Sequence, residues 1–184
     1  MDLIFIYQLL IGFVIIQRLI ELYYSKKNID YILSQGGKVI PEMNYLFMVI
    51  LHFSWLAGLT YNILVPIQQV DLDFNFIFFL SVFVMGQCFR ILAMKALGKR
   101  WTTRIAILPN VDVIDRGIFR YIKHPNYIGV ILEILALPLM IHLYLFSIFF
   151  SVSNIIILYF RVKKEEESLR HYNNYSAVFG KSSL

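Results

Sequence analysis

One stretch decides how this chain folds: Tyr121-Ile122-Lys123-His124-Pro125-Asn126-Tyr127-Ile128-Gly129, followed by Val130-Ile131-Leu132-Glu133. It marks the point at which a basic, polar loop becomes a long apolar run. The residue before a proline is disfavoured in the helical region, and proline itself suits the first turn of a helix, where its missing N–H costs nothing. We therefore expect His124 to be non-helical and Pro125 to begin a helix whose free N–H groups attract carboxylates and phosphates.

The chain as a whole is too apolar for a soluble domain. Its 184 residues are 59% hydrophobic and 16% charged, with a mean hydropathy of +0.66, whereas soluble domains are about 45–50% apolar and 25% charged. A single cysteine, Cys88, excludes a disulfide framework and a cysteine-based metal site. The composition predicts one all-α, membrane-embedded domain over residues 1–184, without a metal.

Five apolar segments are candidates for crossing the membrane, which takes a helix about 20 apolar residues. The last two share one apolar run from Tyr127 to Phe160, which we expect to fold as a hairpin that turns at Ile141-His142-Leu143. The five segments are 3–24, 43–66, 74–97, 126–142 and 143–162.

The basic residues predict an orientation. Fifteen of the seventeen lysines and arginines lie in or beside three segments, 25–42, 98–125 and 161–184. Five spans place all three segments on one side, and an excess of lysine and arginine marks the cytoplasmic side. We therefore expect the N-terminus outside and the C-terminus in the cytosol. This border of basic residues explains the pI near 9.3 better than nucleic-acid binding, and we predict no nucleic-acid partner.

Several polar side chains lie inside the predicted spans. Arg18 and Glu21 are three residues apart near the inner end of the first span. We expect a structural ion pair, or side chains that extend to the membrane surface, rather than a binding pair. His52 is expected to hydrogen-bond to a neighbouring helix, and Arg90 either to extend to the membrane surface or to line a site. Glu133 lies about two turns into the fourth span, where a carboxylate is costly unless it is paired or faces a polar cavity.

Two motifs resemble the isoprenylcysteine carboxyl methyltransferase family of membrane enzymes: Lys123-His124-Pro125-Asn126-Tyr127-x-Gly129, and Arg161-x-x-x-Glu165-Glu166-x-x-Leu169 in the tail. Further residues are similar to a bacterial branch that O-methylates long-chain alkylpyrones and alkylresorcinols. They are Arg18-Leu19-Ile20-Glu21, Ser25, Asn28, Gly36-Gly37, His52, Gly98–Arg104, Leu108-Pro109 and Glu133. The chain departs from that pattern at Asn110, where glycine is expected, and at Gly117-Ile118-Phe119-Arg120, where Gly-Pro-Tyr-Arg is expected.

The resemblance implies a methyl donor, S-adenosylmethionine (SAM), held between the histidine-proline motif and a cytosolic helix of the tail. The donor-pocket residues that it implies are His124, Pro125, Tyr127, Gly129, Arg161, Glu165 and Glu166. The implied acceptor is a hydrophobic, lipid-like molecule that arrives through the bilayer, and the implied location is a bacterial inner membrane.

The chemistry of the acceptor suggests catalytic residues. Methyl transfer depends mostly on positioning, but a hydroxyl acceptor must also lose its proton. A carboxylate in a low-dielectric site is suited to that work, so we hypothesise that Glu133 is the base or orients the acceptor. Arg104 or Arg120 would then stabilise the oxyanion. A carboxylate acceptor, such as a prenylated cysteine, needs no base and is the alternative substrate. A non-catalytic lipid-binding membrane protein is the alternative from another class.

Overall fold

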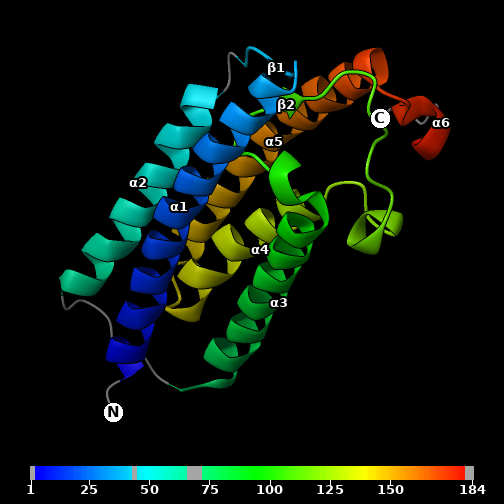
Figure 1. Ribbon diagram of the computed structural model, residues 1–184. Helices are drawn as coiled ribbons and strands as arrows, with labels where there is room; N and C mark the ends of the chain where they lie inside the picture. Colours follow the sequence, from blue (N-terminus) through cyan, green and yellow to red (C-terminus); the bar gives the residue numbers. More distant parts are fainter. Residues whose placement is uncertain (1–2, 43–44, 66–71, 181–184) are drawn as a thin grey trace.

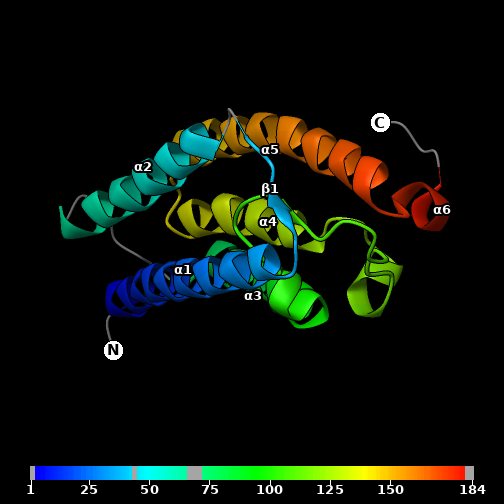
Figure 2. The same ribbon diagram turned by 45° about the horizontal axis from the view of Figure 1, so that its top comes forward.

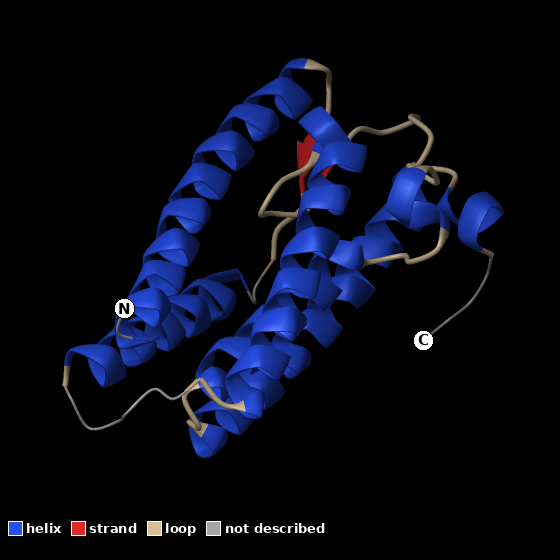
Figure 3. Cartoon of the chain, turned by 90° about the horizontal axis from the view of Figure 1, so that it is seen from below, coloured by secondary structure: helices blue, strands red, loops and turns tan. Residues whose placement is uncertain are grey.

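The computed structural model describes residues 3–42, 45–65 and 72–180, and these are almost entirely helical (Figures 1 and 3). The main helices are α1 (Leu3–Ser34), α2 (Tyr45–Leu64), α3 (Phe74–Leu97), α4 (Pro125–Met140) and α5 (Tyr144–Tyr172). The short elements are the strands β1 (Lys38–Val39) and β2 (Ala106–Ile107), the 3-10 helices η1 (Gly98–Arg100) and η2 (Gly117–Arg120), and α6 (Tyr175–Phe179). Much of the predicted outer loop 67–73, and Lys181 of the tail, lie outside the described residues.

Four helices, α1, α2, α3 and α5, are long and apolar enough to cross a membrane. Their outer faces carry large apolar side chains such as Phe53, 73% exposed, and Leu145, 84% exposed, which soluble monomers rarely gather in continuous patches. The chain is therefore an all-α integral membrane protein, as its composition predicts. The apolar helix α4 is shorter: its 16 residues span about 24 Å, less than the roughly 30 Å of a hydrocarbon core.

Helix α4 lies in the middle of the molecule. Figure 2 shows it between α5 on one side and α1 and α3 on the other. Small residues bring α3 and α4 together, because a Cβ built on Gly129 would lie 2.6 Å from the carbonyl oxygen of Gly86. Membrane helices approach closely where such small residues face each other. Gly129 of the histidine-proline motif therefore lets helix α3 approach α4 closely.

The hairpin of α4 and α5 sets which residues meet at its open end. Helix α4 begins at Pro125, with His124 outside the helical region at φ −130° and ψ 59°, as predicted. It ends at Met140, and α5 begins at Tyr144 after the expected turn. Both helices rise about 1.5 Å per residue from that turn, so Pro125 lies level with a point near residue 160 of α5. The rest of α5 extends past the start of α4.

A ring of four charged side chains ties α1 to α3 and α4. Arg18 donates to Glu21 at 3.0 Å and to Glu133 at 2.6 Å. Arg90 donates to Glu133 at 2.6 Å and also pairs with Glu21, which closes the ring. The predicted Arg18–Glu21 pair is thus present as one side of a larger cluster. Gln87 also donates to Glu133, at 2.9 Å.

The connection between α3 and α4 is fixed by a second, small core. Strands β1 and β2 pair antiparallel, with Lys38 opposite Ile107, and Ile40, Ile105 and Ile107 are buried together beside them. Ile105 and Ile107 of this connection therefore pack against the β1 strand, whereas Val111 is 41% exposed. Asn110, in the place of an expected glycine, has a φ of 59°, a left-handed conformation that asparagine tolerates better than most residues.

Candidate functional site

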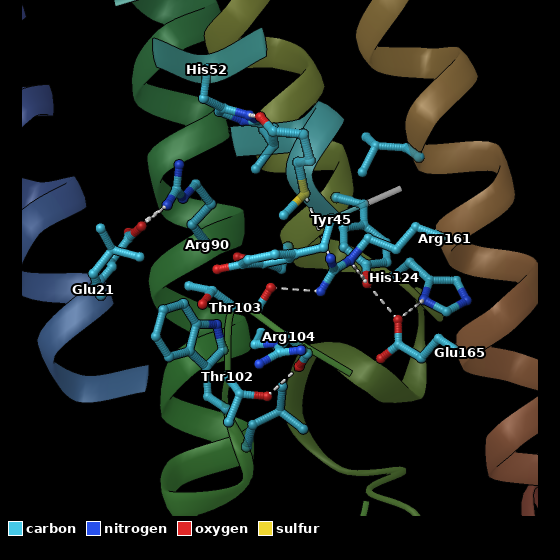
Figure 4. Close-up of a pocket in the computed structure, with 18 of the residues that line it drawn as sticks. Glu21, Tyr45, His52, Arg90, Thr102, Thr103, Arg104, His124, Arg161 and Glu165 are labelled. Carbon is cyan, nitrogen blue, oxygen red and sulfur yellow. Dashed lines mark hydrogen bonds and ion pairs between the residues drawn. The ribbon is translucent and has the colours of Figure 1, made fainter. Parts of the chain in front are cut away.

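One continuous cavity of about 920 Å³ runs from the end of the helices at which the basic segments gather into the apolar part of the helical bundle. Figure 4 shows part of its lining. We define its two parts by their residues and name them after the orientation that the basic residues predict. The cytosolic arm is lined by His124, Pro125, Asn126, Tyr127, Arg161, Glu165 and Tyr175, together with Arg104. The membrane arm lies between α1 and α2 and is lined by Ile15, Arg18, Leu19, Leu22, Met48, His52, Phe53, Leu56, Tyr61 and Leu64.

Tyr127 lies at the centre of the cytosolic arm, between two charged side chains of α5. Its hydroxyl donates to Glu165 Oε2 at 2.6 Å and accepts from Arg161 Nε at 2.9 Å. These three side chains meet because the hairpin of α4 and α5 places the start of α4 beside the part of α5 near residue 160. The side chain of Glu165 is 31% exposed, so one carboxylate next to an aromatic ring remains open to a ligand.

His124 is held from behind by Glu166. Its Nε2 donates to Glu166 Oε1 at 3.0 Å, and its ring stacks on Tyr127 with the centroids 5.5 Å apart. Glu166 also accepts from Tyr175 at 2.8 Å and from Arg170 at 2.8 Å. Burial, and then the hydrogen bond to Glu166, raise the pKa of the Tyr175 phenol, so this tyrosine stays a neutral donor.

Glu42, which the motifs did not indicate, is a further part of this network. It accepts from Arg161 Nη1 at 2.7 Å through Oε2 and from the backbone N–H of Ile105 through Oε1 at 2.7 Å. Its side chain is only 5% exposed, so it fixes Arg161 against the end of the loop. The segment 25–42 carries two acids, Asp30 and Glu42, beside three lysines, so no sequence signal distinguished Glu42.

The C-terminal part of α1 holds the wall of the cavity formed by residues 101–104. Ser25 Oγ accepts from the backbone N–H of Thr103 at 2.8 Å, and Asn28 donates to the carbonyl of Trp101 at 2.7 Å. The carbonyl of Thr103 in turn accepts from Arg161 Nη2 at 2.7 Å. Two residues singled out by resemblance, Ser25 and Asn28, thus position a loop that carries cavity residues.

The structure brings together most, but not all, of the residues predicted for the site. Six of them line the cavity: Arg104, His124, Pro125, Tyr127, Arg161 and Glu165. Glu166 lies directly behind His124. Gly129 lies at the α3–α4 contact, where a Cβ would also meet Arg90 Cγ at 2.5 Å.

Glu133 lies outside the cavity, and its geometry does not support the predicted role of base. Its side chain is completely buried, and both carboxylate oxygens accept from Arg18, Arg90 and Gln87. A base needs a lone pair within reach of the acceptor's proton. The carboxylate oxygens of Glu133 instead accept hydrogen bonds from the two arginines of the ring and from Gln87. In the structure, the negative charge of Glu133 compensates the positive charges of Arg18 and Arg90 together with Glu21.

The two arginines proposed for the oxyanion differ in position. Arg104 lines the cavity, with its guanidinium carbon 5.2 Å from the centre of the Tyr45 ring. Arg120 is exposed on η2 and is not among the residues that line the cavity. The geometry therefore favours Arg104.

His52 corrects another expectation. It was expected to hydrogen-bond between helices, but Nδ1 bonds the carbonyl of Met48 one turn earlier on the same helix, at 2.8 Å. The carbonyl oxygen of Met48 lies one helical turn before His52 on α2, so the imidazole is hydrogen-bonded without a neighbouring helix.

Comparisons with known proteins agree with this arrangement. The model of the isoprenylcysteine carboxyl methyltransferase family matches residues 78–171. An uncharacterized Bacillus subtilis protein, YpbQ, is 31% identical over 165 residues, which cover 90% of this chain and 97% of that protein. An uncharacterized Haemophilus influenzae protein is 22% identical over 157 residues, or 84% of this chain and 89% of that protein. No solved structure matches.

Proposed function

Because this chain belongs to the isoprenylcysteine carboxyl methyltransferase family, a family of membrane methyltransferases, we propose that it transfers a methyl group from SAM to a hydroxyl of a lipid-like acceptor. One observation carries the proposal: a single cavity joins a charged cytosolic arm to an apolar membrane arm. A water-soluble donor and a membrane-soluble acceptor have to meet in such a space. The volume of about 920 Å³ is at the upper end for small-molecule sites.

The residues of the cytosolic arm fit the chemistry of the donor. Glu165 offers a carboxylate for an ammonium or ribose hydroxyl, and the faces of Tyr127 and His124 suit a cation. The side-chain oxygen of Asn126 is buried without a hydrogen-bond partner among the described residues, which a donor hydroxyl or amine would supply. When bound, SAM supplies an electrophilic methyl group on a sulfonium centre. Tyr127, His124 and Glu165 then act by holding its cationic part.

The membrane arm suits a long apolar acceptor whose head reaches the cytosolic arm. We favour a long-chain phenol, enolic pyrone or similar hydroxyl, because Arg104 lines the cavity and is able to stabilise an oxyanion. Carboxyl methylation, which the name of the family describes, is the second candidate. An acceptor panel decides between them: a long-chain alkylresorcinol, the same ring without its chain, and a farnesylated cysteine. We expect turnover of the first compound above that of the other two.

The basic segments support an orientation for this membrane protein. The cytosolic arm of the cavity lies at the end of the helices where the basic loop and the tail gather. We propose that this end faces the cytosol, where SAM is made, with the N-terminus outside. The two bacterial relatives support a bacterial inner membrane, with membrane lipids as the surroundings and no nucleic-acid partner.

The first prediction concerns donor binding, measured by calorimetry on detergent-purified protein. We expect Glu165→Gln and His124→Ala each to weaken SAM binding by roughly tenfold to a hundredfold, since each removes a charged or hydrogen-bonding contact. Glu167→Gln is the matched control, because this neighbour of the cluster is exposed on α5. Folded wild type that binds no SAM would contradict the proposed function.

The second prediction concerns turnover of the hydroxyl acceptor. Arg104→Ala is expected to lower kcat by roughly a hundredfold, the usual cost of an oxyanion partner, while SAM affinity stays unchanged. Arg116→Ala removes an exposed arginine that is not among the cavity-lining residues and serves as control. Equal kcat values for Arg104→Ala and wild type would remove Arg104 from the proposed chemistry.

A further inference from the structure

The membrane arm of the cavity contains an imidazole in a mostly apolar lining. His52 projects from α2 and is flanked along the helix by Met48, Val49 and Leu56, which line the cavity with it. Figure 4 shows His52 in the same space as Arg90 and Tyr45. A polar side chain in a membrane helix is costly and usually faces the bundle interior or a cavity, where it often serves function.

The hydrogen bond to Met48 fixes the tautomer of this ring. The carbonyl oxygen of Met48 only accepts, so His52 Nδ1, 2.8 Å away, must carry the hydrogen. A neutral imidazole with hydrogen on Nδ1 has a lone pair on Nε2. Nε2 has no hydrogen-bond partner in the part of the chain that the structure describes. The ring therefore holds a proton-accepting atom to which no described residue donates a hydrogen bond.

The other acids in the region are already engaged. Glu133 lies outside the cavity with its oxygens bound by two arginines. Glu21 lines the cavity, but it is bound by Arg18, Arg90 and Gln17. Glu165 lies in the cytosolic arm, where the proposed function assigns its open carboxylate to the methyl donor. Of the described residues that line the membrane arm, His52 is the one with a free nitrogen lone pair.

The charges that face His52 come from three neighbouring helices: Arg18 of α1, Arg90 of α3 and Glu133 of α4. Together with Glu21 they form the closed ring described above, in which two positive and two negative charges balance.

We infer that His52 is the base that takes the proton of the hydroxyl acceptor. The inference rests on the proposed function. It gives His52 the role of base that the sequence analysis had assigned to Glu133. The acceptor's O–H bond breaks as Nε2 gains the proton, and the oxygen's electron pair forms the new C–O bond. The methyl group leaves the donor's sulfonium as the S–C pair stays on sulfur, which becomes a neutral thioether. The proton then passes from His52 to water.

The test is His52→Asn, whose amide nitrogen reproduces the hydrogen bond to Met48 but leaves no lone pair at the position of Nε2. Two acceptors are compared: a long-chain alkylphenol and its ortho-nitro derivative, at a pH where only the nitro compound is ionised. We expect kcat for the phenol to fall by roughly a hundredfold to ten-thousandfold. The ionised acceptor needs no base, so its kcat should fall less than about threefold. SAM binding by calorimetry verifies that the variant is folded.

His142→Asn is the matched control, because His142 lies at the outer turn and its left-handed φ of 56° suits asparagine. Equal loss with both acceptors, or no loss with either, would overturn the role of His52 and leave the proposed function standing. Wild type that binds SAM but methylates neither compound would overturn the proposed acceptor class, and this inference with it.

Discussion

Replacing Glu133 by leucine is expected to lower stability by about 3–5 kcal/mol, the usual cost of leaving a buried charge without its partner. Arg18 and Arg90 would then share the single carboxylate of Glu21 in a region where Arg90 is 1% exposed. The midpoint of thermal unfolding in detergent should fall by on the order of 10 °C.

A double variant separates charge imbalance from lost packing. Arg18→Leu together with Glu133→Leu leaves Arg90 and Glu21 as a neutral pair, and buried ion pairs are often replaced by apolar residues at little cost. We expect the double variant to be more stable than Glu133→Leu alone. If both variants unfold at the same temperature, the ring does not stabilise the fold through charge balance.

Gly129→Ala is expected to be strongly destabilising, because the new Cβ would press against the backbone of the neighbouring helix α3. The new Cβ would lie 2.6 Å from the carbonyl oxygen of Gly86 and 2.5 Å from Cγ of Arg90, whose guanidinium is held in the ring. Helices α3 and α4 would have to separate, at a cost of about 1–3 kcal/mol or more. His124, one turn away at the start of α4, would move with them, so SAM affinity should fall as well.

Two other glycines provide a graded comparison by thermal unfolding. A Cβ on Gly86 would lie 3.0 Å from the carbonyl of Gly129, whereas a Cβ on Gly12 of α1 would meet nothing within 4 Å. The expected order of destabilisation is Gly129→Ala, then Gly86→Ala, with Gly12→Ala neutral or slightly stabilising because alanine favours helix. A Gly129→Ala protein as stable as Gly12→Ala would show that the close approach of α3 and α4 is not required.

The parts of the fold that follow local rules were predictable from the sequence. The start of α4 at Pro125 follows from proline geometry, and the turn at 141–143 from the length of the apolar run. The helical tail carrying Arg161 and Glu165 was expected, and it extends unbroken from α5 to Tyr172. The two-residue strands β1 and β2 were not expected, because so short a pairing leaves no periodic pattern.

The errors concern contacts between residues distant in sequence. Glu133 was correctly identified as a costly buried carboxylate, but the sequence does not show that Arg18, 115 residues earlier, and Arg90 both point at it. Glu42 was missed for the same reason, since its partner Arg161 lies 119 residues away. His52 was placed in the right helix with the wrong partner. Pairings of this kind become visible only when the helices are packed.

The shared turn of α4 and α5 has a consequence for how this protein can change in evolution. Tyr127 and Arg161 meet because the chain between them makes two helices of fixed length around residues 141–143. Deleting one residue from α5 before Arg161 would rotate the following side chains by about 100° and turn Arg161 away from Tyr127. The lipid-facing side chains in this segment are free to be exchanged for one another, while insertions and deletions should survive only as whole helical turns or in compensating pairs.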